Sequence, residues 1–201
     1  MSFGAVAHES RYCWALEQFA SANDVVLDFG CGSGYGTNIL AEKASSCLGL
    51  DISEAGISYA RRTFVRPGLQ YEVADLADPS VGDRYDRQFD LIVSFDVIEH
   101  VQHYFHFAEN IAKLLRTSGT ALIGCPNRLE TFTWNDRWTE FHVQEFTPDQ
   151  LKWLLSHYFD EVEILGQDFA DARVKASAVA SMRTSLRARL ARYPFIVRAV
   201  R

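Results

Sequence analysis

Two groups of residues in this chain have types and spacings that suit chemistry. The first is a loop in the segment VVLDFGCGSGYGT, which has glycine at positions 30, 32, 34 and 36 directly after an apolar stretch. Gly30, Gly32 and Gly34 carry no side chain and reach backbone angles closed to other residues, so a ligand can approach the main chain closely. Asp51 follows 21 residues after Gly30, where an acid can accept hydrogen bonds from both hydroxyls of a ribose. The loop therefore predicts a nucleoside-bearing ligand.

The loop departs from the dinucleotide pattern G-x-G-x-x-G in two ways. The position of the third glycine is taken by Tyr35, and Asp28 stands two residues before the first glycine. A negative charge at Asp28 would oppose a pyrophosphate but would suit an ammonium group. The pattern thus favours a nucleoside that carries an amino acid and argues against a dinucleotide-dependent oxidoreductase.

The second group contains Asp96, Glu99 and His100 in the segment DVIEH, and His142 with Glu145 in the segment FHVQEF. These residues allow three interpretations. In the first, His100 or His142 is a general base, because neutral imidazole has a pKa near neutrality. In the second, Asp96, Glu99, His100 and His142 bind a divalent metal that lowers the pKa of an acceptor hydroxyl. In the third, Glu99 and His100 cap and pack the following helix and His142 packs beneath a loop.

The elements that must position these residues alternate between strands and helices, which is typical of a mostly parallel, doubly wound sheet with helices on both faces, a Rossmann-like α/β fold. Predicted strands are Val25–Asp28, Cys47–Asp51, Gln70–Val73, Leu91–Phe95, Thr120–Cys125 and Val162–Leu165. Predicted helices are His8–Ala20, Tyr35–Lys43, Glu54–Thr63, Tyr104–Arg116 and Pro148–His157. Because ligands of such sheets lie beyond the carboxyl ends of the strands, Asp28, Asp51, Asp75 and Phe95 should converge on one rim.

Five motifs between about Val25 and Asn127 resemble those of the class I S-adenosylmethionine-dependent methyltransferases. They are DFGCGSG, LGLDIS, VADLADP, FDLIVSFDVIEHV and LLRTSGTALIGCPN, in the order that the family has them. The resemblance implies S-adenosylmethionine as cofactor. It also implies a contact for each of these residues: Asp28 with the methionine amine, Gly30, Gly32 and Gly34 through the loop backbone, Asp51 with the ribose, Ile52 with the adenine face, Asp75 and Leu76 with the adenine edge, and Phe95 at the exit of its strand.

Other segments narrow the resemblance. DVIEH is similar to the E-x-x-E-H metal motif of small-RNA 2′-O-methyltransferases and ubiquinone-pathway O-methyltransferases, with Asp96 in place of the first glutamate. AHESRYCWA, FHVQEF and VEILGQ resemble methyltransferases associated with bacterial surface-polysaccharide biosynthesis, whose acceptors are sugar hydroxyls or related groups. The expected function is therefore O-methylation of a small molecule or glycan precursor. The alternative is a non-catalytic S-adenosylmethionine-binding partner or regulatory module.

Aromatic residues flank His142 and could wall an acceptor pocket or simply fill a lid. They are Trp134, Trp138, Phe141 and Phe146. Packing against a sugar would suit such side chains, although nothing in the composition identifies a sugar.

Length and composition predict one domain. The chain has 201 residues and is 48% hydrophobic, enough for one substantial core. It has no apolar run near the roughly 18 residues that cross a bilayer and no signal-peptide pattern in its first 20 residues, so a cytoplasmic enzyme is expected. Four scattered cysteines without a C-x-x-C pair suggest neither a zinc site nor a disulfide framework.

Charge divides the chain into a methyltransferase domain over residues 1–171 and a basic extension over residues 172–201. All 26 acidic residues occur at or before Asp171, whereas the last 30 residues contain eight of the 20 basic residues. An acidic domain disfavours nucleic acid as a partner. The extension has apolar residues at helical spacing with arginines around them, namely Leu186, Leu190, Tyr193, Val197 and Val200 with Arg183, Arg187, Arg192 and Arg198, and Pro194 would kink that helix.

Three locations or states are possible for this predicted helix. It could lie on an anionic membrane surface, dock on the acidic domain of the same chain or of a second copy in a homodimer, or stay disordered. No convincing seventh strand follows Leu165, and Arg173–Val179 is a poor candidate for one.

Overall fold

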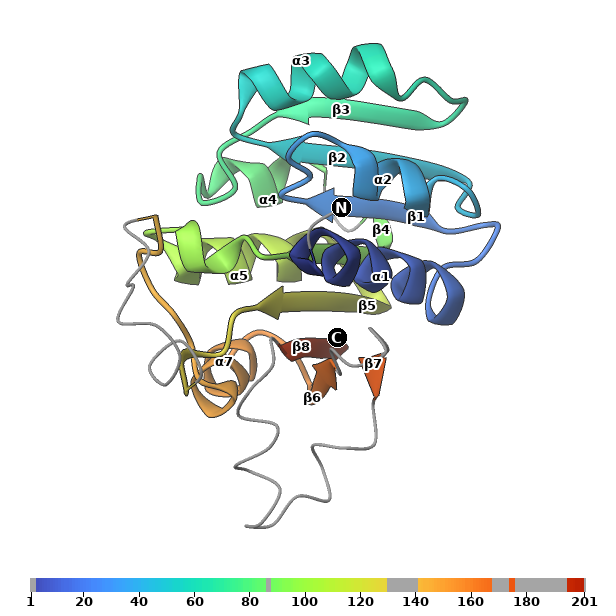
Figure 1. Ribbon diagram of the computed structural model, residues 1–201. Coiled ribbons are helices and arrows are strands. Elements are labelled where there is room, and N and C mark those ends of the chain that lie inside the picture. Colours follow the sequence, from blue (N-terminus) through green and yellow to red (C-terminus); the bar gives the residue numbers. More distant parts are fainter. Residues whose placement is uncertain (1–2, 86–87, 130–140, 168–173, 176–194, 201) are drawn as a thin grey trace.

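The computed structural model describes residues 3–85, 88–129, 141–167, 174–175 and 195–200. In these residues one eight-stranded sheet has the order β3-β2-β1-β4-β5-β8-β6-β7, with helices packed against it (Figure 1). The strands are β1 Val25–Phe29, β2 Ser46–Asp51, β3 Leu69–Val73, β4 Phe89–Phe95, β5 Leu115–Cys125, β6 Glu161–Gln167, β7 Val174–Lys175 and β8 Phe195–Val200. The pairs among β1 to β5 are all parallel, whereas β8 runs antiparallel to both β5 and β6. The six predicted strands are confirmed, and so is the mostly parallel sheet.

The helices of the described residues match the prediction, with two short additions. They are α1 Phe3–Gln18, α2 Tyr35–Leu40, α3 Glu54–Thr63, α4 Ser80–Arg84, η1 Ile98–His100, α5 Tyr104–Leu114 and α7 Pro148–Leu155. The five predicted helices are present, and α4 and η1, of five and three residues, are the additions. α7 begins with a capping box, in which Thr147 Oγ1 accepts from Gln150 N and the Gln150 side chain accepts from Thr147 N.

Successive residues of the central strands enter opposite cores, because side chains alternate along a strand. Leu27 of β1 belongs to a core that also contains residues of α5 and α7. Val26, the preceding residue of β1, belongs to a second core with residues of α1 and α2. Helices therefore cover both faces of the sheet, as the sequence predicted. Within the part of the chain that the structure describes, no helix has the length and apolar character to cross a membrane.

The C-terminal end of the chain corrects the predicted helix. Val197, Arg198 and Val200 lie in β8, which is inserted between β5 and β6 with Thr120 opposite Val200 and Cys125 opposite Phe195. Both faces of β8 are covered, since Ile196 lies in one core and Val197 in the other. A period of two therefore describes residues 195–200 better than a helical period. The other residues of the predicted helix, up to Pro194, lie outside the described residues.

β8 also changes the predicted division of the chain at residue 171. Residues 195–200 complete the sheet, so this part of the basic extension belongs to the domain. Arg198 shows how its charge is accommodated, because its guanidinium lies 5.8 Å from the centroid of the Phe19 ring and 3.7 Å from the Glu163 carboxylate. β8 supplies the antiparallel strand that the sequence analysis did not find. Of the range Arg173–Val179, the structure describes Val174 and Lys175, which form the two-residue strand β7.

Candidate active site

A cavity of about 690 Å³ opens at the carboxyl ends of β1, β2, β3 and β4, and α1 forms one side of it. The predicted residues that line it are Gly30, Gly32, Asp51, Ile52, Asp75, Leu76, Phe95, Asp96 and His100. The predicted residues that do not line it are Asp28, Gly34, Glu99 and His142. Side chains from four strand ends therefore meet at one rim, as expected for an open parallel sheet.

The glycine loop needs its glycines for different reasons. Gly30 has φ +106°, and a Cβ there would fall 2.3 Å from Cγ2 of Val97. Gly34, at φ +84°, would place a Cβ 2.5 Å from that of Ala60, so its role is to let the loop pack on α3. At Gly32 the φ is +53° and a Cβ would meet no atom within 4 Å. The open space beside Gly32 lies at the cavity wall, where a ligand can approach the bare backbone.

Asp51 joins the loop to β2. Its Oδ2 accepts a hydrogen bond from Gly32 N at 2.7 Å, and its Oδ1 accepts from Ser53 N at 2.8 Å. Both oxygens keep lone pairs for a ligand, because a carboxylate offers about four acceptor positions. Next to it the Ile52 side chain is 66% exposed, which is unusual for a large apolar residue beside a cavity.

Asp75 and Leu76 stand at the end of β3. Asp75 is exposed and its Oδ1 accepts from Ala77 N at 3.0 Å, whereas Leu76 is buried. Both line the cavity. This pair therefore offers one polar and one apolar group to a ligand.

Asp28 is fully buried beneath the glycine loop. Its carboxylate accepts hydrogen bonds from Tyr12 Oη at 3.2 Å and from Thr37 Oγ1 at 2.7 Å. Burial raises the pKa of Asp28 to about 7, although these two hydrogen bonds oppose the shift. The sequence led us to expect this acid to face an ammonium group, but in the structure its carboxylate joins α1 and α2 to β1.

The buried Asp28 makes stability depend on pH. Its pKa in the folded state, about 7, exceeds the unfolded value of 3.8. The stability that Asp28 contributes is therefore fully present below pH 4 and is lost as the pH rises through 7. Asp28→Asn cannot ionise, and we expect its free energy of unfolding to fall less than that of the wild type between pH 5 and pH 8. The difference should be about 2.6 kcal/mol, because roughly two of the three pKa units are expressed between pH 5 and pH 8. Urea unfolding at both pH values measures it.

The exposed Asp83 gives the control for this experiment. Its carboxylate is 73% exposed and pairs with Lys113, so Asp83→Asn should follow the wild type. Equal pH dependence in the Asp28→Asn variant and the wild type would contradict the assignment.

α1 contributes residues that the sequence analysis did not select. His8 lines the cavity, its Nδ1 is hydrogen-bonded to Tyr35 Oη, and burial lowers its pKa. Arg11, three residues later and buried, donates from Nη1 to Asp96 Oδ1 at 2.7 Å. A histidine and an arginine three residues apart on a predicted helix share a face, and that spacing was the available signal.

Asp96 does not join the other predicted metal ligands. It has φ +55°, and its carboxylate pairs with Arg11 and lies 3.6 Å from His8 Nε2. The four-residue set predicted from DVIEH and His142 is therefore corrected to three in the described residues. The physical reason is that a buried arginine on α1 holds the carboxylate of Asp96 on the α1 side of the cavity.

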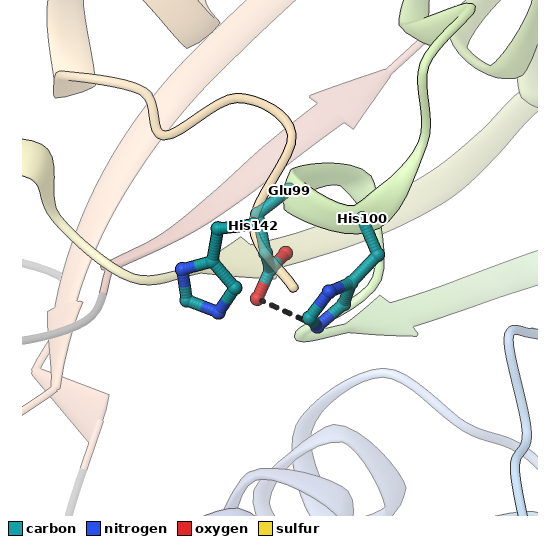
Figure 2. A group of neighbouring side chains, drawn as sticks. All are labelled: Glu99, His100 and His142. Atoms are coloured by element: carbon teal, nitrogen blue, oxygen red, sulfur yellow. Dashed lines mark ion pairs between the residues drawn. The ribbon is translucent and has the colours of Figure 1, made fainter. Parts of the chain in front are cut away.

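Glu99, His100 and His142 come together beside the cavity (Figure 2). One potential ligand atom from each lies within 4.8 Å of the others, and His100 Nε2 is 4.0 Å from Glu99 Oε1. Glu99 is 1% exposed, and neither of its carboxylate oxygens has a hydrogen-bond partner in the described residues. Burial, and secondarily the charge of Asp96, raise the pKa of Glu99 to about 8.

Backbone hydrogen bonds hold this group together. Val143 N and Gln144 N both donate to the carbonyl oxygen of Glu99, at 2.8 and 3.1 Å. These bonds tie η1 to the loop that leads into α7, about 40 residues away along the chain. The same loop places Phe141, which is 73% exposed, and Phe146, which is buried against Tyr104. Trp134 and Trp138 lie outside the described residues.

The two histidines each have one ring nitrogen engaged. His100 Nδ1 lies 2.8 Å from the carbonyl oxygen of Phe141 and must donate to it, because a carbonyl only accepts. His142 Nδ1 lies 2.8 Å from Oε1 of Glu145, a buried carboxylate. When these nitrogens carry the protons, both Nε2 atoms keep their lone pairs. The group can therefore accept a proton or bind a cation.

This chain spans about half the length of the curated proteins to which it is similar. A protein of Mycolicibacterium smegmatis named as a probable S-adenosylmethionine-dependent methyltransferase is 33% identical over 140 residues, 69% of this chain and 52% of that protein. A ubiquinone biosynthesis O-methyltransferase of Stutzerimonas stutzeri is 26% identical over 118 residues, 59% of this chain and 51% of that protein.

Comparisons with solved structures and with family models also point to methyltransferases. The structure of a SAM-dependent methyltransferase from Archaeoglobus fulgidus superposes with a TM-score of 0.73 at 19% identity, covering 100% of this chain and 95% of that one, so the fold is shared. A family model described as a methyltransferase domain matches residues 7–158. These residues contain the cavity, the glycine loop and the Glu99 group. The chain therefore belongs to the class I S-adenosylmethionine-dependent methyltransferase family.

Proposed function

We propose that this protein transfers a methyl group from S-adenosylmethionine to a hydroxyl oxygen of a small molecule or a glycan precursor. The observation that carries the proposal is the continuity of the cavity. One end is formed by Gly32 and Asp51, which suit a nucleoside, and His100 at the other side belongs to the acid–imidazole group around the buried Glu99.

The residues at the nucleoside end fit S-adenosylmethionine. The open space at Gly32 admits a ligand to the backbone, and Asp51 has acceptor capacity left for the ribose hydroxyls. We assign Gly30 and Gly32 to the amino-acid portion, Asp51 to the ribose, Ile52 to the adenine face, and Asp75 with Leu76 to the adenine edge. Asp28 and Gly34 then support the loop from below, and Phe95 borders the methyl-transfer position.

The chemistry asked of the protein is alignment and removal of a proton. S-adenosylmethionine supplies a methyl carbon already activated by its sulfonium. The acceptor oxygen provides the electron pair of the new O–C bond, the C–S bond breaks toward sulfur, and the hydroxyl proton must leave. We assign activation of that hydroxyl to Glu99, His100 and His142, because His100 reaches the cavity wall and Glu99 supports it from the interior.

Two observations support a small hydroxyl acceptor. Relatives of this chain include proteins named as O-methyltransferases of ubiquinone biosynthesis. The net charge of −6 disfavours a nucleic-acid acceptor, which would need a broad basic surface.

The test supplies methyl-labelled S-adenosylmethionine with a panel of phenolic and sugar acceptors, each paired with its deoxy analogue. We expect label in the hydroxyl compounds, one equivalent of S-adenosylhomocysteine per methyl transferred, and no product from the deoxy analogues. Cofactor binding is followed separately by calorimetry. If well-folded protein binds the cofactor but methylates no hydroxyl, the proposal fails and a non-catalytic binding module is favoured.

A further inference from the structure

We propose that Asn110 is a positioning residue that sets the base selectivity of the nucleoside end, because it holds the turn that carries Asp75 and Leu76. The inference rests on the assignment of these two residues to the adenine edge under the proposed function. Asn110 itself lies on α5 and does not line the cavity.

The side chain of Asn110 is 1% exposed and is hydrogen-bonded at both of its polar atoms. Its Nδ2 donates to the carbonyl oxygens of Leu76 at 3.0 Å and of Asp78 at 2.9 Å. Its Oδ1 accepts from Gly82 N at 3.1 Å. A carboxamide has two N–H donors, so both are used, and the opposite orientation would place its oxygen against both carbonyls. The three bonds therefore fix the side chain and tie it to the segment after β3.

The segment that Asn110 holds is the turn from Asp75 to Asp78. Asp78 N donates to the Asp75 carbonyl oxygen at 3.0 Å, and Ala77 N donates to Asp75 Oδ1 at 3.0 Å. Asp75, Leu76 and Ala77 all line the cavity. The same turn thus faces the cavity and is anchored to α5 through two of its carbonyl groups. A shift of these carbonyls would move the residues that meet a ligand.

The short helix α4 limits where the Asn110 side chain can go. α4 lies beside α5 (Figure 1), and a Cβ at Gly82 would fall 2.7 Å from Asn110 Oδ1, too close to be accommodated without a shift. Gly82 therefore leaves just enough room for the carboxamide. Gly82→Ala offers a second way to displace it while keeping its donors.

The turn affects selectivity through the carboxylate that it offers to a base. A carboxylate only accepts hydrogen bonds, so Asp75 suits the exocyclic amino group of adenine. Hypoxanthine has a carbonyl oxygen at that position and cannot donate from it. A site built around a hydrogen bond rejects an analogue that lacks it, provided that the partner is held in place. Asn110 supplies this constraint from outside the cavity.

The experiment measures by calorimetry how tightly the full chain binds S-adenosylhomocysteine and S-inosylhomocysteine, in which a carbonyl replaces the amino group of the base. Wild type should bind the adenosyl ligand about 10- to 100-fold more tightly. Asn110→Leu and Asn110→Asp both lack the two donors, so each should lower this ratio about 10-fold, chiefly by weakening the adenosyl ligand. Asp75→Ala should lower it as well, and Gly82→Ala should lower it less.

Asn127→Leu is the matched control. Asn127 is also buried, and its Oδ1 accepts from Leu129 N at 3.1 Å in a segment that does not line the cavity. This variant should lose stability as Asn110→Leu does but keep the wild-type ratio. The ratio therefore separates positioning of the turn from a merely structural role. If neither Asn110 variant folds, Gly82→Ala decides the test.

A wild-type ratio in a folded Asn110 variant, or in Gly82→Ala where that variant decides, would overturn the inference while Asp75→Ala still loses selectivity. An equal loss of selectivity in Asn127→Leu would overturn it too. If wild type binds both ligands equally, or Asp75→Ala keeps the ratio, the assignment of the adenine edge fails and takes the inference with it. Methyl transfer to a hydroxyl is tested apart from this by the acceptor panel, because these titrations contain no acceptor.

Discussion

Replacement of Asp51 by alanine is expected to weaken S-adenosylmethionine binding by about 100-fold or more. Two hydrogen bonds from ribose hydroxyls to a carboxylate contribute roughly 1.5–3 kcal/mol each, and every 1.4 kcal/mol is about tenfold in affinity. The substitution also removes the acceptor that holds Gly32 N at 2.7 Å, so the glycine loop loses its attachment to β2. Calorimetric titration of both proteins with S-adenosylmethionine and S-adenosylhomocysteine measures the change.

The matched control is Asp83→Ala, which removes an exposed carboxylate on α4 outside the cavity. It should bind both ligands like the wild type. Oxidised nicotinamide dinucleotides should bind to none of these proteins. Undiminished binding of S-adenosylmethionine by a folded Asp51→Ala variant would remove Asp51 from the cofactor site.

Replacement of Glu99 by glutamine is expected to lower the turnover number by about 10²- to 10⁴-fold, the range of an acid–base or hydroxyl-activating contribution. Glutamine keeps the size of the buried side chain but cannot carry its negative charge. The affinity for S-adenosylmethionine should stay within a few-fold of the wild type, because Glu99 does not line the cavity. Turnover with a hydroxyl acceptor and calorimetry with the cofactor separate the two effects.

Glu42→Gln serves as the comparison, since Glu42 lies on the surface, where it pairs with Arg66 at 3.4 Å. Its turnover should equal that of the wild type. If Glu99→Gln retains full turnover, the Glu99 group has no part in methyl transfer and is a packing feature of η1 and the loop before α7.

Asp96 and Glu99 are three residues apart in the sequence but have different surroundings in the structure. Asp96 turns toward α1, where Arg11 neutralises it, whereas Glu99 turns inward and stays without a hydrogen-bond partner among the described residues. The charge of Asp96 is compensated by the Arg11 guanidinium, whereas burial without a hydrogen-bond partner raises the pKa of Glu99. The likeness of DVIEH to a metal motif thus extends to Glu99 and His100 but not to the position of Asp96.

The nucleoside end of the site could be predicted from the sequence because its determinants are local. The positive φ at Gly30 and Gly32 and the hydrogen bond from Gly32 to Asp51 follow from a strand–loop–helix unit and the strand after it. The start of α7 is equally local, since Thr147, Pro148 and Gln150 define it within four residues. Steric limits on the backbone and helix capping depend on residues close together in the sequence, so both can be recognised before the fold is known.

Two features depended on contacts between distant parts of the chain. Residues 195–200 are apolar except for Arg198, and their sequence is compatible with either a helix or a strand. Pairing with β5 on one side and β6 on the other makes them a strand. In the same way, the sequence named Asp96, Glu99, His100 and His142 as one group, but could not decide which carboxylate would turn toward the histidines. Arg11 on α1 and the loop hydrogen bonds to the Glu99 carbonyl made that choice.

The sequence by itself therefore determined the parallel sheet, the glycine loop and the acids of the nucleoside end. Only the tertiary structure decided the strand that completes the sheet, the contribution of α1 to the cavity, and the convergence of Glu99, His100 and His142. The reason is physical: backbone conformation and strand alternation are set by neighbours in the chain. Strand pairing depends on the unpaired backbone groups that folding brings beside a strand. The direction of a carboxylate depends on the charges that folding brings beside it.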